Sequence, residues 1–136
     1  MGPDDQMMAP VECIVRFMQS DEDDGLLDAF EAGGAVIVEN FQPYLFEGLG
    51  AVTRWRDGFR MRVREQMLQD LRAEFGPAQD FDYQRPDLVF FSLPTRWTGF
   101  SAGRAFDETG GWSFVLVRSG AQWKVRSYAW AVTSKT

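Results

Sequence analysis

A candidate β-hairpin near the end of the chain decides the fold: Trp112-Ser-Phe-Val-Leu-Val-Arg118, then Ser119-Gly120, then Trp123-Lys-Val-Arg-Ser-Tyr-Ala-Trp-Ala-Val-Thr133. Large apolar and polar residues alternate in both halves, as in a half-buried strand whose successive side chains point to opposite faces. A two-residue turn at Ser119-Gly120 predicts that Leu116 lies opposite Trp123 and that Phe114 lies opposite Val125. This register places the apolar residues on one face and Tyr128 on the other.

Length and composition narrow the class of protein. With 136 residues, 45% of them apolar and 15% aromatic, the chain can bury a real core. The net charge of −6 argues against nucleic-acid binding, which needs a basic surface. There is no basic-then-apolar leader, and no apolar run approaches the ~18 residues of a membrane span. We therefore expect a cytoplasmic protein with no nucleic acid and no membrane among its partners.

The sequence contains no histidine and a single cysteine, Cys13. The lack of histidine excludes Ser-His and Cys-His catalysis and the zinc sites built on histidine. One cysteine excludes an internal disulfide and fits a reducing compartment. We expect no metal and no cofactor, so proton transfer would depend on a carboxylate, tyrosine or lysine with a shifted pKa.

Helical patterns precede strand patterns along the chain. Residues 1–9 resemble a loose leader, and residues 10–134 form one domain. Apolar residues at helical spacing predict a first helix from Pro10, a short second helix around residues 26–30, and a third over residues 51–67. Strands are expected at residues 35–40, 69–83 with a bulge at Gly76-Pro77, 87–100, 102–118 with a break at Gly110-Gly111, and 123–133. This order predicts an α+β fold.

The layout resembles the nuclear transport factor 2-like superfamily and, within it, the SnoaL-like and ketosteroid isomerase-like group. The likeness rests on the helix-break-helix segment 16–30, the strand Val36-Ile-Val-Glu-Asn40 and the hairpin segment 114–125. It implies a cystatin-like cone, in which a curved antiparallel sheet is wrapped by three helices from the N-terminal half around an apolar pocket. It also implies a homodimer built through the sheet.

The catalytic positions of ketosteroid isomerases do not carry over to this chain. The resemblance puts Asn40 at the position of the carboxylate base, Ile14 at that of the tyrosine, and Ser113, within one residue, at that of the acid. Asparagine cannot take up a proton at neutral pH and isoleucine donates no hydrogen bond, so we do not expect that activity. Asn40 could hold a ligand carbonyl or a water, or it could satisfy the local backbone at a strand end.

SnoaL-like cyclases, which this sequence resembles, use an aspartate deep in the pocket as acid and base. Several carboxylates of this chain lie on the predicted strands or at their ends, and paired carboxylates can raise one pKa into a working range. Exposure at the rim is the alternative, since such residues are seldom buried. The candidates are Glu74, Asp80, Asp82, Asp87, Asp107 and Glu108.

The aromatic residues predict a pocket for a small apolar or aromatic molecule, since tryptophan and tyrosine combine a large apolar surface with a polar tip. The function favoured is that of a SnoaL-like small-molecule pocket protein. If it is an enzyme, we expect an isomerase, cyclase or hydratase that needs no cofactor. The alternative is a non-catalytic dimeric interaction module whose cone is filled by these side chains. The candidate ligand-binding residues are Asn40, Tyr44, Trp55, Trp112, Tyr128 and Trp130.

The predicted third helix carries five arginines within eleven residues, at positions 54, 56, 60, 62 and 64. Three of them repeat every four residues and form one stripe, which could bind an anion or an acidic partner. We expect instead a solvated outer face, where such charges contribute little to stability.

Overall fold

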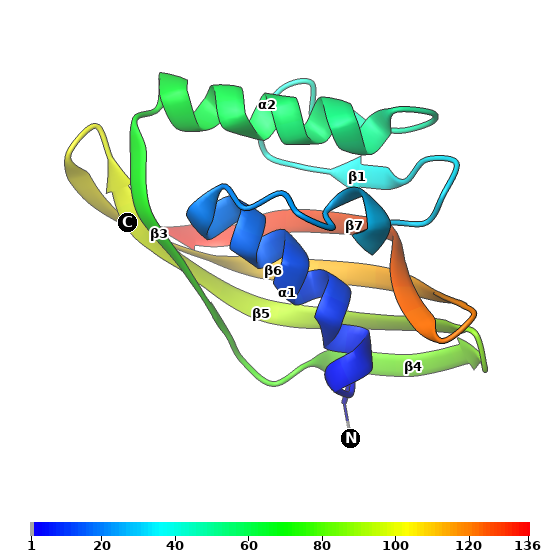
Figure 1. Ribbon diagram of the computed structural model, residues 1–136. Coiled ribbons are helices and arrows are strands. Elements are labelled where there is room, and N and C mark those ends of the chain that lie inside the picture. The colour runs from blue at the N-terminus through cyan, green and yellow to red at the C-terminus, as the bar shows by residue number, and fades with distance from the viewer. Residues whose placement is uncertain (1) are drawn as a thin grey trace.

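The structure is a computed structural model that describes residues 2–136, with the backbone alone for residues 82–84. Over this range two α-helices lie on the concave side of a curved sheet of seven strands (Figure 1). The helices are α1 (Asp5–Ser20) and α2 (Ala51–Glu65). The strands are β1 (Val36–Val38), β2 (Leu45–Phe46), β3 (Leu68–Phe75), β4 (Gln79–Arg85), β5 (Leu88–Ser101), β6 (Arg104–Ser119) and β7 (Gln122–Lys135). The predicted α+β cone is confirmed.

The strand order is β2-β1-β7-β6-β5-β3, and β4 pairs with β5 as well. All pairs are antiparallel except β1 and β7, which run parallel from Val36 opposite Ser127 to Val38 opposite Ala129. The expectation of a wholly antiparallel sheet was therefore wrong at this edge. The long connection from β1 through α2 and the other strands to β7 permits a parallel pair, which a tight turn cannot make.

Helix α1 begins earlier than its apolar stripe predicts. The Asp4 carboxylate accepts a hydrogen bond of 2.9 Å from the backbone N–H of Met7 and caps the helix, and the Met7 side chain is buried. The predicted second helix is only a 3₁₀ turn, Leu27–Ala29, because Phe30 is already extended and pairs with Val125. Two α-helices and one 3₁₀ turn thus replace the three helices expected. Neither described α-helix has the length and apolar character required to cross a membrane.

The C-terminal hairpin is present, but its register differs from the prediction. Ser119 pairs with Gln122, so the turn lies one residue later than Ser119-Gly120. Leu116 lies opposite Val125 and Phe114 opposite Tyr128, which leaves Arg126 as an extra residue in a β-bulge. The bulge reverses the alternation beyond it. Tyr128 consequently faces the core, with 2% of its surface exposed, and not the outer face as predicted.

The predicted strand over residues 69–83 is two strands, β3 and β4, which pair with the C-terminal and N-terminal halves of β5 respectively. Between them the backbone N–H of Gly76 donates to the carbonyl of Pro94 at 2.8 Å. The expected break at Gly110-Gly111 is absent from β6, which the structure describes throughout and which stays paired with β5 there. Both helices and the inner side chains of the long strands enclose one apolar core.

Candidate functional site

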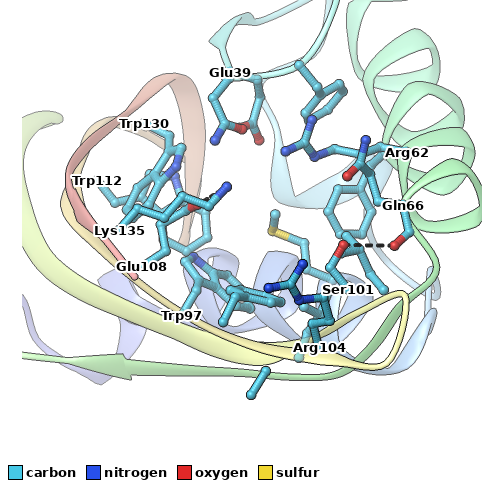
Figure 2. A pocket seen from close by; sticks show the side chains of 18 residues that line it. Glu39, Arg62, Gln66, Trp97, Ser101, Arg104, Glu108, Trp112, Trp130 and Lys135 are labelled. Carbon is cyan, nitrogen blue, oxygen red and sulfur yellow. Dashed lines mark hydrogen bonds and ion pairs between the residues drawn. The ribbon is translucent and has the colours of Figure 1, made fainter.

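A cavity of about 300 Å³ lies between α2, the end of β1 and the far ends of β5, β6 and β7 (Figure 2). Its apolar wall includes Phe59, Leu71, Trp97, Trp112 and Trp130. The β5–β6 turn is tied to the end of α2 by two bonds to the Gln66 carbonyl, one from the Ser101 hydroxyl (2.9 Å) and one from the Ala102 N–H (3.1 Å). These bonds fix the wall opposite β1.

The chemically most distinctive group in this wall is the carboxyl group of Glu39, at the end of β1. Its residue is 6% exposed. The indole N–H of Trp55 donates to Oε2 at 3.0 Å, and the hydroxyl of Tyr128 donates to the same oxygen. The backbone of Asn40 also donates a hydrogen bond to this carboxyl group.

Strand pairing positions these three residues. Ile37 lies opposite Tyr128 in the parallel pair. Glu39 is two residues further along the chain, directly after β1, and its side chain is on the same face. The backbone N–H of Glu39 donates to the carbonyl of Tyr44 at 2.9 Å, which holds the strand end. From α2, the Trp55 ring meets the Tyr128 ring edge-on, with 5.9 Å between centroids. The carboxyl group is thus held by two strands and a helix.

Burial raises the pKa of the Glu39 carboxyl group above its usual value, since the charged form loses its hydration. Hydrogen bonds from Tyr128, Trp55 and the Asn40 backbone, and the charge of Arg62, oppose that rise. Burial and the neighbouring Glu39 carboxylate raise the pKa of Tyr128 well above 10, so the phenol remains a proton donor in a hydrogen bond. A carboxyl group whose pKa is raised is a suitable acid/base group for proton transfer.

Trp112 contributes a second polar atom. Its residue is 1% exposed and lines the cavity. Its indole Nε1 has no hydrogen-bond partner among the side chains and backbone groups that the structure describes. An unpaired buried donor costs free energy, and an acceptor that reached this N–H would remove that cost.

The cavity also contains charged side chains at its rim: Arg62 from α2, Arg104 and Glu108 from β6, and Lys135 from β7. Lys135 and Glu108 lie opposite each other in the β6–β7 pair, with 3.6 Å between Nζ and Oε2. Within the described part of the chain, no three acidic or cysteine side chains cluster as a metal site would require.

No protein-family model and no curated protein sequence matches this chain. Several solved structures, however, match its fold. The hexachlorocyclohexane dehydrochlorinase LinA Type2 superposes with a TM-score of 0.79 at 9% identity, over 96% of this chain and 85% of that one. A scytalone dehydratase-like protein from Novosphingobium aromaticivorans superposes with a TM-score of 0.67 at 11% identity, over 97% of this chain and 89% of that one. Aln2 from a Streptomyces species superposes with a TM-score of 0.68 at 22% identity, over 97% of this chain and 94% of that one.

This chain has the nuclear transport factor 2-like fold. In the nuclear transport factor 2-like cone, three of the predicted ligand-binding residues line the cavity: Asn40, Trp112 and Trp130. Trp55 and Tyr128 lie behind Glu39 and contact its carboxyl group, outside the cavity lining. Tyr44 is 51% exposed and is not part of the lining either.

Of the five acid/base candidates whose side chains the structure describes, Glu108 alone lines this cavity. Asp107 and Glu74 face Arg96, at 2.7 and 3.8 Å, and Asp87 faces Arg85 at 3.2 Å. Asp80 is exposed, and the side chain of Asp82 lies outside the described residues. The deep carboxyl group of the cone is instead Glu39.

Sequence reasoning missed Glu39 because it aligned the neighbouring Asn40 with the catalytic position of ketosteroid isomerases. The signal was present in the strand itself. In Val36-Ile-Val-Glu39 the burial alternates, with Ile37 and Glu39 inside and the two valines outside. An acidic residue on the inner face of an otherwise apolar strand is rare unless it is partnered, and is therefore a candidate for function.

Proposed function

We propose that this protein is a SnoaL-like enzyme that transfers a proton within a small, largely apolar substrate, by isomerisation or elimination, with Glu39 as its acid/base group. The observation that carries the proposal is the Glu39 carboxyl group at the cavity wall, buried and bonded through one oxygen to Trp55 and Tyr128. Burying a carboxyl group lowers stability unless it is partnered, and a buried carboxyl group with a raised pKa at a cavity is typical of functional sites.

The proposed step begins with ionised Glu39. Its carboxylate takes a proton from a substrate carbon next to a carbonyl group. The electron pair of the broken C–H bond forms a C=C bond to the carbonyl carbon, and the π pair of the carbonyl group moves onto its oxygen. The Trp112 indole N–H donates to that oxygen and stabilises its charge. Glu39 then returns the proton to another carbon, which completes an isomerisation, or a leaving group departs, which completes an elimination.

The structural neighbours support this reaction class by their names. LinA Type2 is a dehydrochlorinase, and another neighbour is scytalone dehydratase-like. Both names describe eliminations, in which a proton and a leaving group are lost from one molecule. The side chains of this chain are sufficient for the proton transfer itself, and we propose that no cofactor takes part.

The competing function is a non-catalytic interaction module with a filled cone. A cavity of about 300 Å³ with a buried carboxyl group in its wall weighs against it, because packed interiors rarely leave voids larger than a water molecule. The cavity is large enough for a bicyclic aromatic molecule and small enough to exclude a large polycyclic one.

The test is hydrogen exchange on a carbon acid of suitable size. The protein is incubated in heavy water with β-tetralone, a bicyclic ketone, and deuterium incorporation is followed by NMR. Wild-type protein should accelerate the exchange, and Glu39→Gln should lower the rate by about 100-fold. Glu65→Gln, an exposed change at the end of α2, is the control and should leave the rate unchanged. Equal exchange by Glu39→Gln and wild type would refute the role of Glu39.

We also propose that the protein is a homodimer through the outer face of its sheet. Val36, Val38 and Leu45 are 42, 39 and 45% exposed on that face, and Ala129 and Ala131 beside them are exposed as well. Apolar and small side chains on one sheet face favour association with a second copy. Light scattering during size-exclusion chromatography should give twice the chain mass, and Val38→Lys should give one chain mass.

A further inference from the structure

Three cationic side chains at the cavity remain without a role in the proposed reaction. They come from three elements, Arg62 from α2, Arg104 from the start of β6 and Lys135 from the end of β7. Figure 2 shows them reaching toward the same space from different sides of the cavity. Arg62 is not one of the stripe arginines singled out in the sequence, and its position on α2 turns it to the cavity.

Five of the ten arginines outside the cavity have an acidic partner within 4 Å among the described side chains. Arg60 pairs with Asp21 and Asp23, Arg96 with Asp107, and Arg126 with Glu31, all between 2.7 and 3.0 Å. No carboxylate among the described side chains (residues 2–81 and 85–136) lies within 4 Å of Arg62 or Arg104, so both guanidinium groups lack an ion pair at the cavity. Arg62 instead lies over the Phe41 ring, 5.8 Å from its centroid.

The charge balance of the cavity is opposite in sign to that of the whole protein. The chain carries a net charge of −6, yet three cationic side chains line the cavity against two acidic ones, Glu39 and Glu108. Glu39 is bonded to Trp55 and Tyr128, and Glu108 faces Lys135. The two arginines therefore present a local positive field to any ligand that enters.

We propose that the substrate is a carboxylate attached to a largely apolar, aromatic-sized body, and that Arg62 and Arg104 bind the carboxylate group at the rim while the tryptophan-lined wall takes the body. The guanidinium groups suit this task, since their paired N–H donors match the two oxygens of a carboxylate. This inference rests on the proposed function, because it names the substrate class of the same cavity.

The test uses two probes that differ in charge and little in shape, β-naphthoate and its neutral amide, β-naphthamide. Binding is measured by isothermal titration calorimetry and by quenching of the tryptophans in the cavity wall. Wild-type protein should bind β-naphthoate at least about tenfold more tightly than β-naphthamide, as expected for hydrogen bonds to a charged group. Higher salt should weaken the binding of naphthoate and leave that of naphthamide unchanged.

Arg62→Gln and Arg104→Gln should each lower the affinity for β-naphthoate about tenfold and leave the affinity for β-naphthamide within about twofold. Arg62→Lys keeps the charge and should fall between wild type and Arg62→Gln. Arg64→Gln is the matched control, because Arg64 lies on the same helix, is exposed and is not part of the cavity lining. Circular dichroism confirms that each variant is folded.

Equal affinity of wild type for the two probes, or arginine variants that bind naphthoate like wild type, would overturn the inference and leave the cavity proposal standing. Failure of both probes to bind would overturn the inference and weaken the cavity proposal with it. Exchange of β-tetralone decides the proposed reaction separately, since that neutral ketone needs neither arginine.

Discussion

The hydroxyl of Tyr128 donates a hydrogen bond to the carboxyl group of Glu39, although the two residues are 89 positions apart in the chain. The parallel pairing of β1 with β7 and the bulge at Arg126 together bring them to one face. Without the bulge, Tyr128 would point to the outer face of the sheet and Glu39 would lose one of its two side-chain donors. The bulge therefore links the register of the hairpin to the chemistry of the cavity.

Tyr128→Phe should raise the pKa of Glu39 further, because the hydrogen bond from Tyr128 lowers it. Below its pKa the ionised fraction of Glu39 then falls, and the exchange rate with β-tetralone should decrease there by about tenfold. NMR of protein labelled with ¹³C at glutamate carboxyls reports the titration, and the pH midpoint of the exchange rate should move upward with it. Tyr44→Phe, at an exposed tyrosine, should change neither quantity. A midpoint that stays in place in Tyr128→Phe would contradict the arrangement.

Glu39→Gln should change how stability depends on pH. Because the folded-state pKa of Glu39 is raised above 4.5, the folded protein keeps a proton that the unfolded chain has already released. Wild-type stability should therefore fall, relative to Glu39→Gln, as pH rises from about 4.5 to the raised pKa, with a slope approaching about 1.4 kcal/mol per pH unit. Urea unfolding across that pH range measures both proteins. If the free energies of unfolding of the two proteins changed with pH in parallel, the pKa of Glu39 would not be raised by folding.

The bulge residue Arg126 forms a two-pronged ion pair with Glu31, at 2.9 and 3.0 Å. That pair lowers the pKa of Glu31, so its contribution is present above the usual glutamate value and is lost as pH falls through the lowered one. Both side chains are about a third or more exposed, so solvent screening limits the coupling to at most about 1 kcal/mol. A double-mutant cycle with Glu31→Gln and Arg126→Gln should find this coupling at neutral pH and lose it in acid. A coupling independent of pH would rule out an ionic origin.

Local patterns in the sequence predicted the elements well where one face is apolar. The stripe Val52, Trp55 and Phe59 is the buried side of α2, and the alternation of Phe114 and Leu116 is the inner face of β6. These patterns are decided by neighbours in the chain, and burial follows from them directly.

The site was harder to predict because it depends on pairing between distant segments. A single extra residue in β7 reversed the orientation of Tyr128, and periodicity alone does not reveal a bulge. The large-small alternation in Ser127-Tyr-Ala-Trp-Ala131 would have revealed it, since it places Tyr128 and Trp130 on one face. Glu39 could have been found from the burial pattern of its own strand. Its two side-chain donors, Trp55 and Tyr128, could not have been found that way, because they come from α2 and β7.

The two neighbouring glycines of β6 should respond very differently to alanine. A Cβ at Gly110 would overlap the carbonyl oxygen of Ala131 and lie 2.8 Å from Cη2 of Trp130, whereas at Gly111 the nearest side-chain atom is the Ser92 hydroxyl at 3.8 Å. Gly110→Ala should therefore cost about 1–3 kcal/mol in the free energy of unfolding, because backbone and ring must both shift. Gly111→Ala, the matched control, should leave stability unchanged or raise it slightly.

Gly110→Ala should also disturb ligand binding, since Trp130 lines the cavity and its ring must move to admit the new methyl group. Affinity for β-naphthamide should fall in Gly110→Ala and stay at the wild-type level in Gly111→Ala, in titrations carried out well below the unfolding temperature of both variants. Similar stability and affinity in the two variants would mean that β6 and β7 approach less closely at Gly110 than the structure has them. From the sequence, Gly110 is expected to break the strand. Loss of affinity in Gly110→Ala alone would show that a residue without a side chain is needed here for Trp130 to occupy the cavity wall.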